Sequence, residues 1–225
     1  MKILVLNGSP RKKSDTMHIT NAFLKGINSN NEYEIEIIDV INKTIKPCLG
    51  CFKCVENGDN LCIQEDDQNE ILKKMLLSDI IVWSFPLYFF SLPSHLKAVL
   101  DRTLPFGKKE MKIENERIVH VTNIDLQKKK YIMISGCGFP YFESNFKAVK
   151  QLFHNTYADV TTICISEAPM FNAASASNLT EPLLENIKNA GIEFNKFGEL
   201  SLETSLLIET PMLPRDVYIQ ICNNR

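Results

Sequence analysis

Short apolar segments alternate with amphipathic segments along most of the chain. Runs of β-branched and large apolar residues, which are typical of buried strands, occupy residues 2–6, 34–41, 79–85, 130–135 and 160–166. Apolar positions three and four residues apart predict helices over residues 17–27, 67–77, 91–103 and 144–157. Because strands that alternate with helices pair in the same direction, the pattern predicts a parallel sheet with helices on both faces.

Two parts of the chain fall outside this alternation. Residues 109–121 contain two strand-like pieces around residues 114–116, which predicts a hairpin inserted between the third helix and the fourth strand. Helical patterns at 181–194 and 215–222 predict a C-terminal helical extension, as a cover or a dimer arm. With these additions, we expect an α/β fold: a flavodoxin-like doubly wound five-stranded parallel sheet of strand order 2-1-3-4-5.

The composition is that of an ordinary globular protein. The chain has 225 residues, and 25 Lys and Arg against 27 Asp and Glu give a formal net charge of −2. This balance excludes a strongly basic nucleic-acid binder, so we expect no nucleic-acid partner. The length and the lack of a Ser/Gly-rich linker predict a single domain over residues 1–225, with its core at about 1–168 and the extension at about 169–225.

The apolar segments and the cysteines bear on location. No apolar stretch reaches the roughly 20 residues that a membrane-spanning helix needs, and the first residues lack the pattern of a secretory signal. We therefore expect a cytoplasmic protein without a membrane partner. Seven cysteines, of which four lie between Cys48 and Cys62, favour metal or redox chemistry over a disulfide framework in that compartment.

The loop after the first strand has the composition of a phosphate site. Residues 8–16 offer backbone N–H groups, the hydroxyls of Ser9, Ser14 and Thr16, and the guanidinium of Arg11, all at the positive end of a predicted helix. The loop lacks the Gly-Lys-Ser/Thr ending of a P-loop and the G-x-G-x-x-G of a dinucleotide site, which argues against nucleoside triphosphates. The alternative is a surface turn followed by a helix cap.

Three motifs together resemble the NAD(P)H-dependent FMN reductase family. They are Asn-Gly-Ser-Pro-Arg at residues 7–11, Ser-Phe-Pro-Leu-Tyr-Phe at residues 84–89, and Lys97 with Asp101-Arg102, and the similarity spans about residues 1–165. The resemblance implies that the first loop holds the FMN phosphate, through Ser9, Arg11, Ser14, Asp15 and Thr16. It implies that the second loop packs along the isoalloxazine, through Pro86, Leu87, Tyr88 and Phe89. It implies that a third loop approaches the pyrimidine side of the ring, through Ser135, Gly136, Cys137 and Gly138.

The second loop also has an independent physical rationale. A flavin ring favours flat apolar neighbours and backbone amides near its polar edge, which residues 86–90 can supply. The other reading of this segment is packing in the core or at a helix entry.

Four cysteines form the motif C-x2-C-x2-C-x7-C, at Cys48, Cys51, Cys54 and Cys62. Thiols at this spacing can wrap a cubane, and the motif resembles the iron-sulfur flavoprotein branch of the same family, which implies a [4Fe-4S] cluster beside FMN. Zinc fits less well, because its four-cysteine sites pair two C-x2-C knuckles across a longer spacer. The second reading is an inherited structural loop with reduced thiols or a redox-labile pair. Both readings stay open on the sequence.

The remaining candidates for chemistry are weak. We expect Cys164 and Cys222 to lie in the core and Cys137 to be an exposed thiol of the third loop. The acidic residues 65–67 are interpreted as a helix start, and the histidines His18, His95, His120 and His154 as surface or packing residues. No nucleophile with an adjacent base is evident, so no catalytic side chain is assigned.

A flavin mechanism needs no such side chain, because hydride passes from nicotinamide to FMN. The sequence and the resemblance therefore predict an FMN-dependent NAD(P)H oxidoreductase, homodimeric, with a small electron acceptor such as a quinone, a nitroaromatic compound or a flavin. The first alternative is an iron-sulfur flavoprotein in electron transfer, with a [4Fe-4S] cluster and a ferredoxin-type partner. The second is a non-enzymatic flavin-binding or thiol redox-sensing module.

Overall fold

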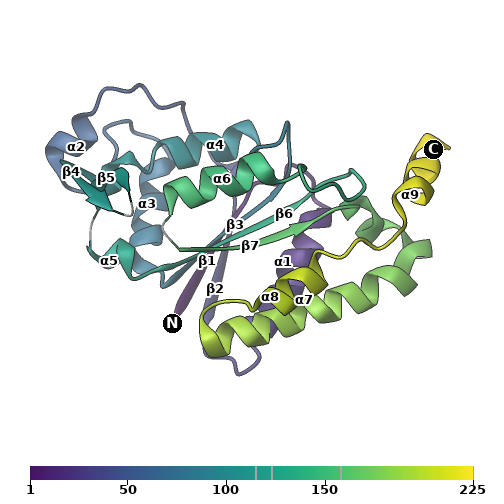
Figure 1. The fold of residues 1–225 in the computed structure, drawn as a ribbon. Coiled ribbons are helices and arrows are strands. Elements are labelled where there is room, and N and C mark those ends of the chain that lie inside the picture. The colour runs from purple at the N-terminus through teal and green to yellow at the C-terminus, as the bar shows by residue number, and fades with distance from the viewer. Residues whose placement is uncertain (115, 123, 158, 225) are drawn as a thin grey trace.

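One parallel sheet forms the centre of the molecule. The computed structural model describes residues 1–114, 116–122, 124–157 and 159–224. The sheet consists of β1 (Lys2–Asn7), β2 (Glu34–Asp39), β3 (Ile80–Pro86), β6 (Lys130–Gly136) and β7 (Val160–Ile165). All its strands are parallel, in the order β2-β1-β3-β6-β7 (Figure 1). Counted along the sheet-forming strands this is 2-1-3-4-5, so the predicted flavodoxin-like fold is confirmed.

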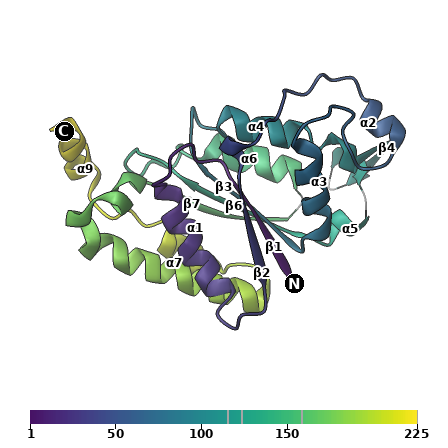
Figure 2. The same ribbon diagram turned by 180° about the vertical axis from the view of Figure 1, so that it is seen from behind.

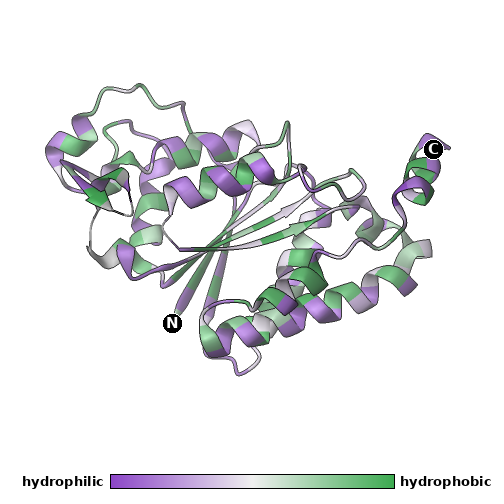
Figure 3. Ribbon diagram, in the orientation of Figure 1, coloured by the Kyte–Doolittle hydropathy of each residue, from purple (hydrophilic) through white to green (hydrophobic). Residues whose placement is uncertain are grey.

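Helices cover both faces of the sheet. The first face carries α1 (Asp15–Ile27), α7 (Ser177–Phe197) and α8 (Leu202–Ile208), and the second carries α3 (Gln68–Leu77), α4 (Ser94–Asp101) and α6 (Lys147–Thr156) (Figures 1 and 2). Each face has its own apolar core, and the helices show apolar stripes against the sheet (Figure 3). Every residue of β3 is buried, as its nearly all-apolar run predicts for a central strand covered on both faces.

The inserted hairpin is confirmed and is longer than predicted. Strands β4 (Gly107–Glu114) and β5 (Arg117–Thr122) pair antiparallel, and α5 (Ile124–Gln127) follows them. Asn115, in the predicted turn, lies outside the described residues. A short helix, α2 (Lys53–Asn57), lies beside the hairpin and was not predicted, since a five-residue helix shows no periodicity.

The C-terminal segment contributes more than a cover. The predicted helix at 181–194 extends to the bounds of α7, which packs along α1. Helix α8 was missed because seven residues carry little pattern, although Ser201 caps it by accepting a hydrogen bond from the Thr204 N–H. Helix α9 (Arg215–Asn223) projects from the body (Figure 1). Among the described residues, no helix is long and apolar enough to cross a membrane.

Short 3-10 helices occupy several connections. They are η1 (Val40–Asn42), η2 (Leu104–Phe106), η3 (Ala168–Asn172) and η4 (Ala174–Ala176). Helix α4 begins at Ser94 rather than at residue 91, because the chain first makes a tight turn and Pro93 then occupies the N-cap position.

Candidate functional site

The loop after β1 is tied to both neighbouring strands. Asn7 donates a hydrogen bond from Nδ2 to Oδ1 of Asp39 at the end of β2, at 2.8 Å. On the other side, the Gly8 N–H donates to the Ser84 carbonyl oxygen of β3 at 2.8 Å, and Nε2 of His95 donates to the Gly8 carbonyl oxygen at 2.9 Å. The helix after β1 and the helix after the neighbouring β3 lie on opposite faces of the sheet, and open α/β sheets bind ligands at such a point.

Beyond this anchor, the loop gathers hydroxyl groups at the positive end of α1. Ser9 and Thr16 are buried, and Ser9 Oγ accepts a hydrogen bond from the Arg11 N–H at 3.3 Å. Ser14 is the N-cap of α1 and accepts from the Met17 N–H at 3.2 Å. The predicted phosphate-loop residues therefore lie together, at a helix end that favours negative charge.

Asp15 is held by protein groups rather than by solvent. It is buried and pairs with the Arg11 guanidinium and with Nδ2 of Asn172. Asn172 ends η3, and its Oδ1 accepts from Nε2 of His18 at 3.2 Å, while the His18 ring stacks on Phe171. Sequence reasoning missed this clamp, because Asn172 and Phe171 lie more than 150 residues further along the chain in a segment without a motif.

The loop after β3 turns its aromatic residues outward. Pro86 is buried and Leu87 is half-buried, while the side chains of Tyr88 and Phe89 are exposed. The Leu87 N–H donates to the Gly136 carbonyl oxygen at 2.8 Å, which ties this loop to the loop after β6. Backbone amides and exposed rings thus lie at the same edge of the sheet as the loop after β1.

The tip of this loop is a strained two-residue turn. Tyr88 and Ser91 exchange both backbone hydrogen bonds, at 3.0 and 2.9 Å, across a turn made of Phe89 and Phe90. Both phenylalanines have positive φ, 47° and 62°, which disfavours residues with a side chain. Phe90 stacks on Phe139, with ring centroids 6.4 Å apart. Strain of this kind is concentrated at functional sites.

The loop after β6 completes the arrangement. Ser135 is buried at the end of the strand, and its Oγ has no hydrogen-bond partner among the residues that the structure describes. Gly138 accepts, through its carbonyl oxygen, a hydrogen bond from the Tyr218 hydroxyl at 3.0 Å. Tyr218 belongs to α9, so the C-terminal helix fixes this loop, which the sequence did not indicate.

Cys137 is buried, so the expectation of an exposed thiol was wrong. Only 4% of its surface is exposed, and its sulfur lies within 3.9 Å of Asn145 Nδ2 and Ser166 Oγ. Burial raises the pKa of the Cys137 thiol, and the charge of Glu167 adds to this rise. The sequence pattern around the loop after β6 did not predict this burial, because the residues that cover Cys137 come from the segment after β7.

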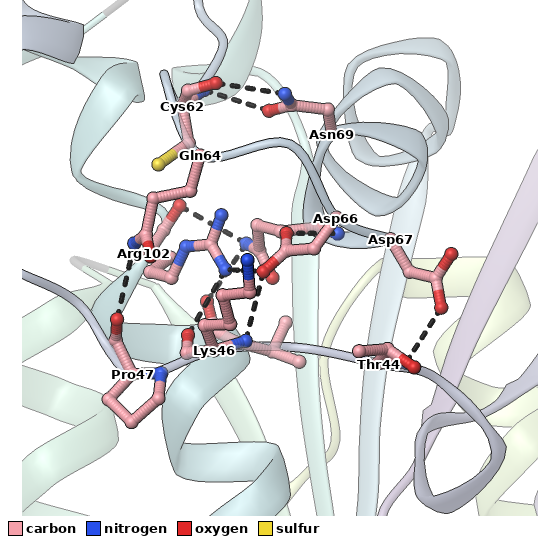
Figure 4. Close-up of polar contacts among 11 residues, drawn as sticks. Thr44, Lys46, Pro47, Cys62, Gln64, Asp66, Asp67, Asn69 and Arg102 are labelled. Carbon is pink, nitrogen blue, oxygen red and sulfur yellow. Dashed lines mark hydrogen bonds and ion pairs between the residues drawn. The ribbon is translucent and has the colours of Figure 1, made fainter.

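The four-cysteine loop leaves the same edge of the sheet and is closed at its base. We call residues 44–47 and 64–67 the neck of this loop. Asp66 accepts hydrogen bonds through Oδ2 from the Lys46 N–H at 2.9 Å and from Nη1 of Arg102 at 2.5 Å (Figure 4). Burial alone would raise the pKa of Asp66, but the bonds from Arg102 and from the Lys46 and Gln68 N–H groups hold it below its usual range.

Further contacts position the two sides of the neck. Asp67 accepts a hydrogen bond from the Thr44 N–H at 2.7 Å, and Nε2 of Gln64 donates to the Pro47 carbonyl oxygen at 3.2 Å. The prediction that the acidic residues mark a helix start is correct, since Asp67 occupies the N-cap position of α3. Its carboxylate makes no capping bond, however, because it bonds across the neck instead.

The cysteines themselves differ in exposure. Cys48 and Cys51 are exposed, Cys62 is half-buried and Cys54 is buried. Burial raises the pKa of Cys54, with smaller contributions from the charges of Cys62 and Cys51. Within the described ranges no three metal-ligating side chains lie close enough to hold an ion. Four thiols on one loop are the donor set that a cubane takes, but the structure does not bring three of them together.

The other cysteines and the histidines are outside this loop. Cys164 is buried as predicted, but Cys222 is exposed, because α9 projects from the body and leaves that face uncovered. His18, His120 and His154 are exposed and His95 is half-buried, as expected of surface or packing residues.

Comparison with known proteins identifies the family. The chain matches the model described as flavodoxin-like fold over residues 1–190. It belongs to this family. It is 37% identical over 105 residues to an iron-sulfur flavoprotein of Methanocaldococcus jannaschii. The aligned residues make up 47% of this chain and 53% of that protein. An iron-sulfur flavoprotein of Archaeoglobus fulgidus is 32% identical over 109 residues, 48% of each chain. The family member thus spans about half the length of these curated relatives.

Solved structures agree on the fold of this family member. An NAD(P)H:quinone oxidoreductase from Methanothermobacter marburgensis has a TM-score of 0.63 at 16% identity, covering 86% of this chain and 96% of that chain. An FMN-dependent NADH-azoreductase from Bacillus anthracis has a TM-score of 0.62 at 16% identity, covering 87% of this chain and 100% of that chain. The resemblance to the FMN reductases and their iron-sulfur branch, inferred from the motifs, is confirmed at the level of family.

Proposed function

We propose that this chain is an FMN-dependent oxidoreductase that takes electrons from NADH or NADPH and passes them to a small acceptor. The observation that carries the proposal is the convergence of three loops at the carboxyl edge of the sheet. The loop after β1 offers hydroxyls and a helix end for a phosphate, and the loops after β3 and β6 offer aromatic rings and backbone amides. The names of the two solved structures with the same fold, an NAD(P)H:quinone oxidoreductase and an FMN-dependent NADH-azoreductase, support it.

In this proposal each loop has its own task. Ser9, Ser14, Thr16 and Arg11 bind the phosphate, while Asp15 keeps Arg11 in place. Pro86, Leu87, Tyr88 and Phe89 line the ring, and the backbone of residues 135–138 faces its polar edge. FMN, when bound, supplies hydride acceptance from nicotinamide and electron donation to a quinone, a nitroaromatic compound or another flavin. The protein orients the ring and excludes water.

The phosphate loop provides the test. Replacing Arg11 and Ser14 together by alanine should remove most of the bound FMN, because the variant loses the guanidinium and the hydroxyl that cap the phosphate site. The measurement is the ratio of FMN to protein after gel filtration. The matched control is Lys25→Ala, an exposed lysine at the far end of α1. A double variant that retains stoichiometric FMN would contradict the assignment of this loop.

A second candidate function is electron transfer through an iron–sulfur cluster. The specific observation that favours it is the four-cysteine loop, whose neck is paired by Asp66 and Arg102, together with relatives named iron-sulfur flavoprotein. Cys48, Cys51, Cys54 and Cys62 would hold the cluster, which would exchange single electrons with a ferredoxin-type partner. Iron and sulfide bound in stoichiometric amounts, with negligible oxidation of NADH and NADPH, would favour this function over the first.

The C-terminal helix supports the proposal of a homodimer. Helix α9 exposes Val217, Ile219 and Ile221 on a segment that projects from the body. Since Tyr218 of the same helix fixes the loop after β6, a second copy bound to α9 would lie next to the candidate ring site. We propose a cytoplasmic homodimer on this basis and on the sequence, and sedimentation equilibrium of the full chain distinguishes it from a monomer.

A further inference from the structure

Glu167 is a buried carboxyl group, on the segment after β7, that the proposed function does not use. The residue is 0% exposed. Its Oε2 accepts hydrogen bonds from the Met212 N–H at 2.8 Å and from the Leu213 N–H at 3.2 Å. Oε1 is buried as well, and no group in the described part of the chain bonds to it. A buried oxygen without a partner is costly, and native proteins keep such a group where it has a role.

The backbone of Glu167 holds the loop after β6. Its N–H donates to the Phe139 carbonyl oxygen at 2.9 Å, and the N–H of Ala168 donates to the Cys137 carbonyl oxygen at 2.9 Å. Glu167 has a positive φ of 59°, which disfavours residues with a side chain. The chain therefore keeps a strained residue at the point where the segment after β7 is bonded to this loop.

The segment that begins at Glu167 reaches the phosphate loop at its other end. It continues as η3, whose last residue, Asn172, donates a hydrogen bond from Nδ2 to Oδ1 of Asp15. A Cβ on Gly136, in the loop after β6, would lie 2.9 Å from the Cβ of Ala168, so the segment also packs directly against that loop. One short segment thus contacts the loops proposed for the phosphate and for the pyrimidine side of the ring.

The side chain of Glu167 joins this segment to the C-terminal part of the chain. Met212 and Leu213 lie in the connection between α8 and α9, and they pack with Tyr218 of α9 in a small apolar cluster. The Tyr218 hydroxyl donates to the Gly138 carbonyl oxygen at 3.0 Å, which bonds α9 to the loop after β6. In Figure 1 the connection runs from α8 to α9 on the side of the molecule where this loop lies. One carboxyl and one hydroxyl group therefore fix the C-terminal connection to the site.

We propose that Glu167 is a positioning residue for FMN, which makes docking of the α8–α9 connection and binding of the flavin cooperative. The inference rests on the proposed function, because it takes FMN as the ligand of these loops. The role requires an acceptor oxygen and no negative charge. Burial raises the pKa of Glu167, and the bonds from the Met212 and Leu213 N–H groups oppose this rise. A neutral side chain with the same oxygen should therefore replace it.

The first test compares the dissociation constant of FMN for the full chain and three variants, measured by quenching of flavin fluorescence. Glu167→Ala removes the acceptor oxygen, whereas Glu167→Gln keeps an oxygen for the two N–H groups. The matched control is Glu193→Ala, which removes a carboxylate that accepts from the Ser201 N–H at 2.6 Å near the far end of α7. Circular dichroism checks the folded fraction of each variant.

We expect Glu167→Ala to raise the dissociation constant about tenfold, and Glu167→Gln and Glu193→Ala to stay within about twofold of the native chain. If Glu167→Ala binds FMN as the native chain does, the role of Glu167 is overturned and the flavin site stands. Equal weakening in all three variants also overturns that role. A native chain that binds no FMN overturns the flavin site and the role of Glu167 together.

A second measurement needs no variant that folds. Hydrogen exchange of the native chain is recorded at the Met212 and Leu213 amides with and without saturating FMN, and at the Ser201 amide as the internal control. Because coupling between two binding events is reciprocal, FMN should slow exchange at Met212 and Leu213 more than at Ser201. Unchanged exchange, or slowing of equal size at all three amides, in a chain that binds FMN contradicts the proposal, whatever the stability of Glu167→Ala.

Discussion

The loop after β1 and the four-cysteine loop leave neighbouring strands at the same edge of the sheet, yet they are held differently. The first is bonded to β2 and β3 within one residue of the strand end and continues directly into α1. The second is bonded at its neck and, through Asn69, at Cys62, while Cys48 and Cys51 are exposed. The proposed function therefore assigns FMN to a loop that is fixed before a ligand binds, and the alternative function assigns a cluster to a loop whose exposed half is less fixed.

The largest effect is expected at the neck. Asp66→Asn removes the charge that compensates the buried Arg102, so the free energy of unfolding should fall by about 3–5 kcal/mol. Urea unfolding at pH 7 measures it, with Asp101→Asn as the exposed control that should cost less than about 0.5 kcal/mol. A loss below 1 kcal/mol would mean that the neck does not depend on this pair.

The same pair predicts a pH dependence. The pKa of Asp66 in the folded chain lies below its usual value, so the folded state binds fewer protons there than the unfolded state. This contribution to stability is fully present above the unfolded pKa of about 4 and is lost as pH falls through the lower folded pKa. Urea unfolding at a series of pH values from 7 to 3 should show this acid loss in the native chain and a smaller one in Asp66→Asn. Identical pH profiles would contradict the prediction.

Two glycines sharpen the contrast between the loops. A Cβ at Gly8 would lie 2.7 Å from Cδ2 of Leu96 and 3.2 Å from Cβ of Phe85. Gly8→Ala should therefore cost about 1–3 kcal/mol and weaken FMN retention, because the loop after β1 must shift. At Gly50, in the cysteine loop, a Cβ meets nothing within 4 Å, and only the φ of +62° opposes it.

Gly50→Ala should accordingly cost about 1 kcal/mol and leave FMN retention unchanged. Thermal unfolding and FMN content of the two variants measured side by side test this prediction. Equal loss of FMN in both variants would show that the two loops are not independent.

The smallest effect, and one of opposite sign, is expected at the tip of the loop after β3. Phe89 is fully exposed and has φ of 47°, so Phe89→Gly relieves strain and should raise the free energy of unfolding by about 0.5–1 kcal/mol. If the ring lines the acceptor site, the same variant raises the KM for a quinone. Lower stability with an unchanged KM would contradict both roles.

The sequence predicted the sheet because its strands are long apolar runs between helices. Every residue of β3 is buried. The position of β3 beside β1 in the sheet follows from the rules of parallel crossovers. The gathering of Ser9, Arg11, Ser14 and Thr16 was also predictable, since they lie in one segment at one strand end, whereas their role in binding a phosphate stays a prediction.

Contacts between distant segments were not predictable. Asn172 reaches Asp15, Tyr218 reaches Gly138, and Arg102 reaches Asp66, in each case across dozens of residues without a shared motif. Burial of Cys137 had the same cause, because the segment after β7 that closes over it has no periodic pattern. Exposure of Cys222 depends on the projection of α9, which local hydrophobicity does not encode.

The most direct test of the central claim, that the carboxyl edge of the sheet holds FMN, is an absorption spectrum of the full chain purified without oxygen, with flavin and iron assayed on the same sample. The account predicts the two bands of oxidised flavin, FMN in a stoichiometric ratio to protein, and loss of both bands on addition of NADH or NADPH. A chain that retains no flavin even after incubation with excess FMN would contradict it.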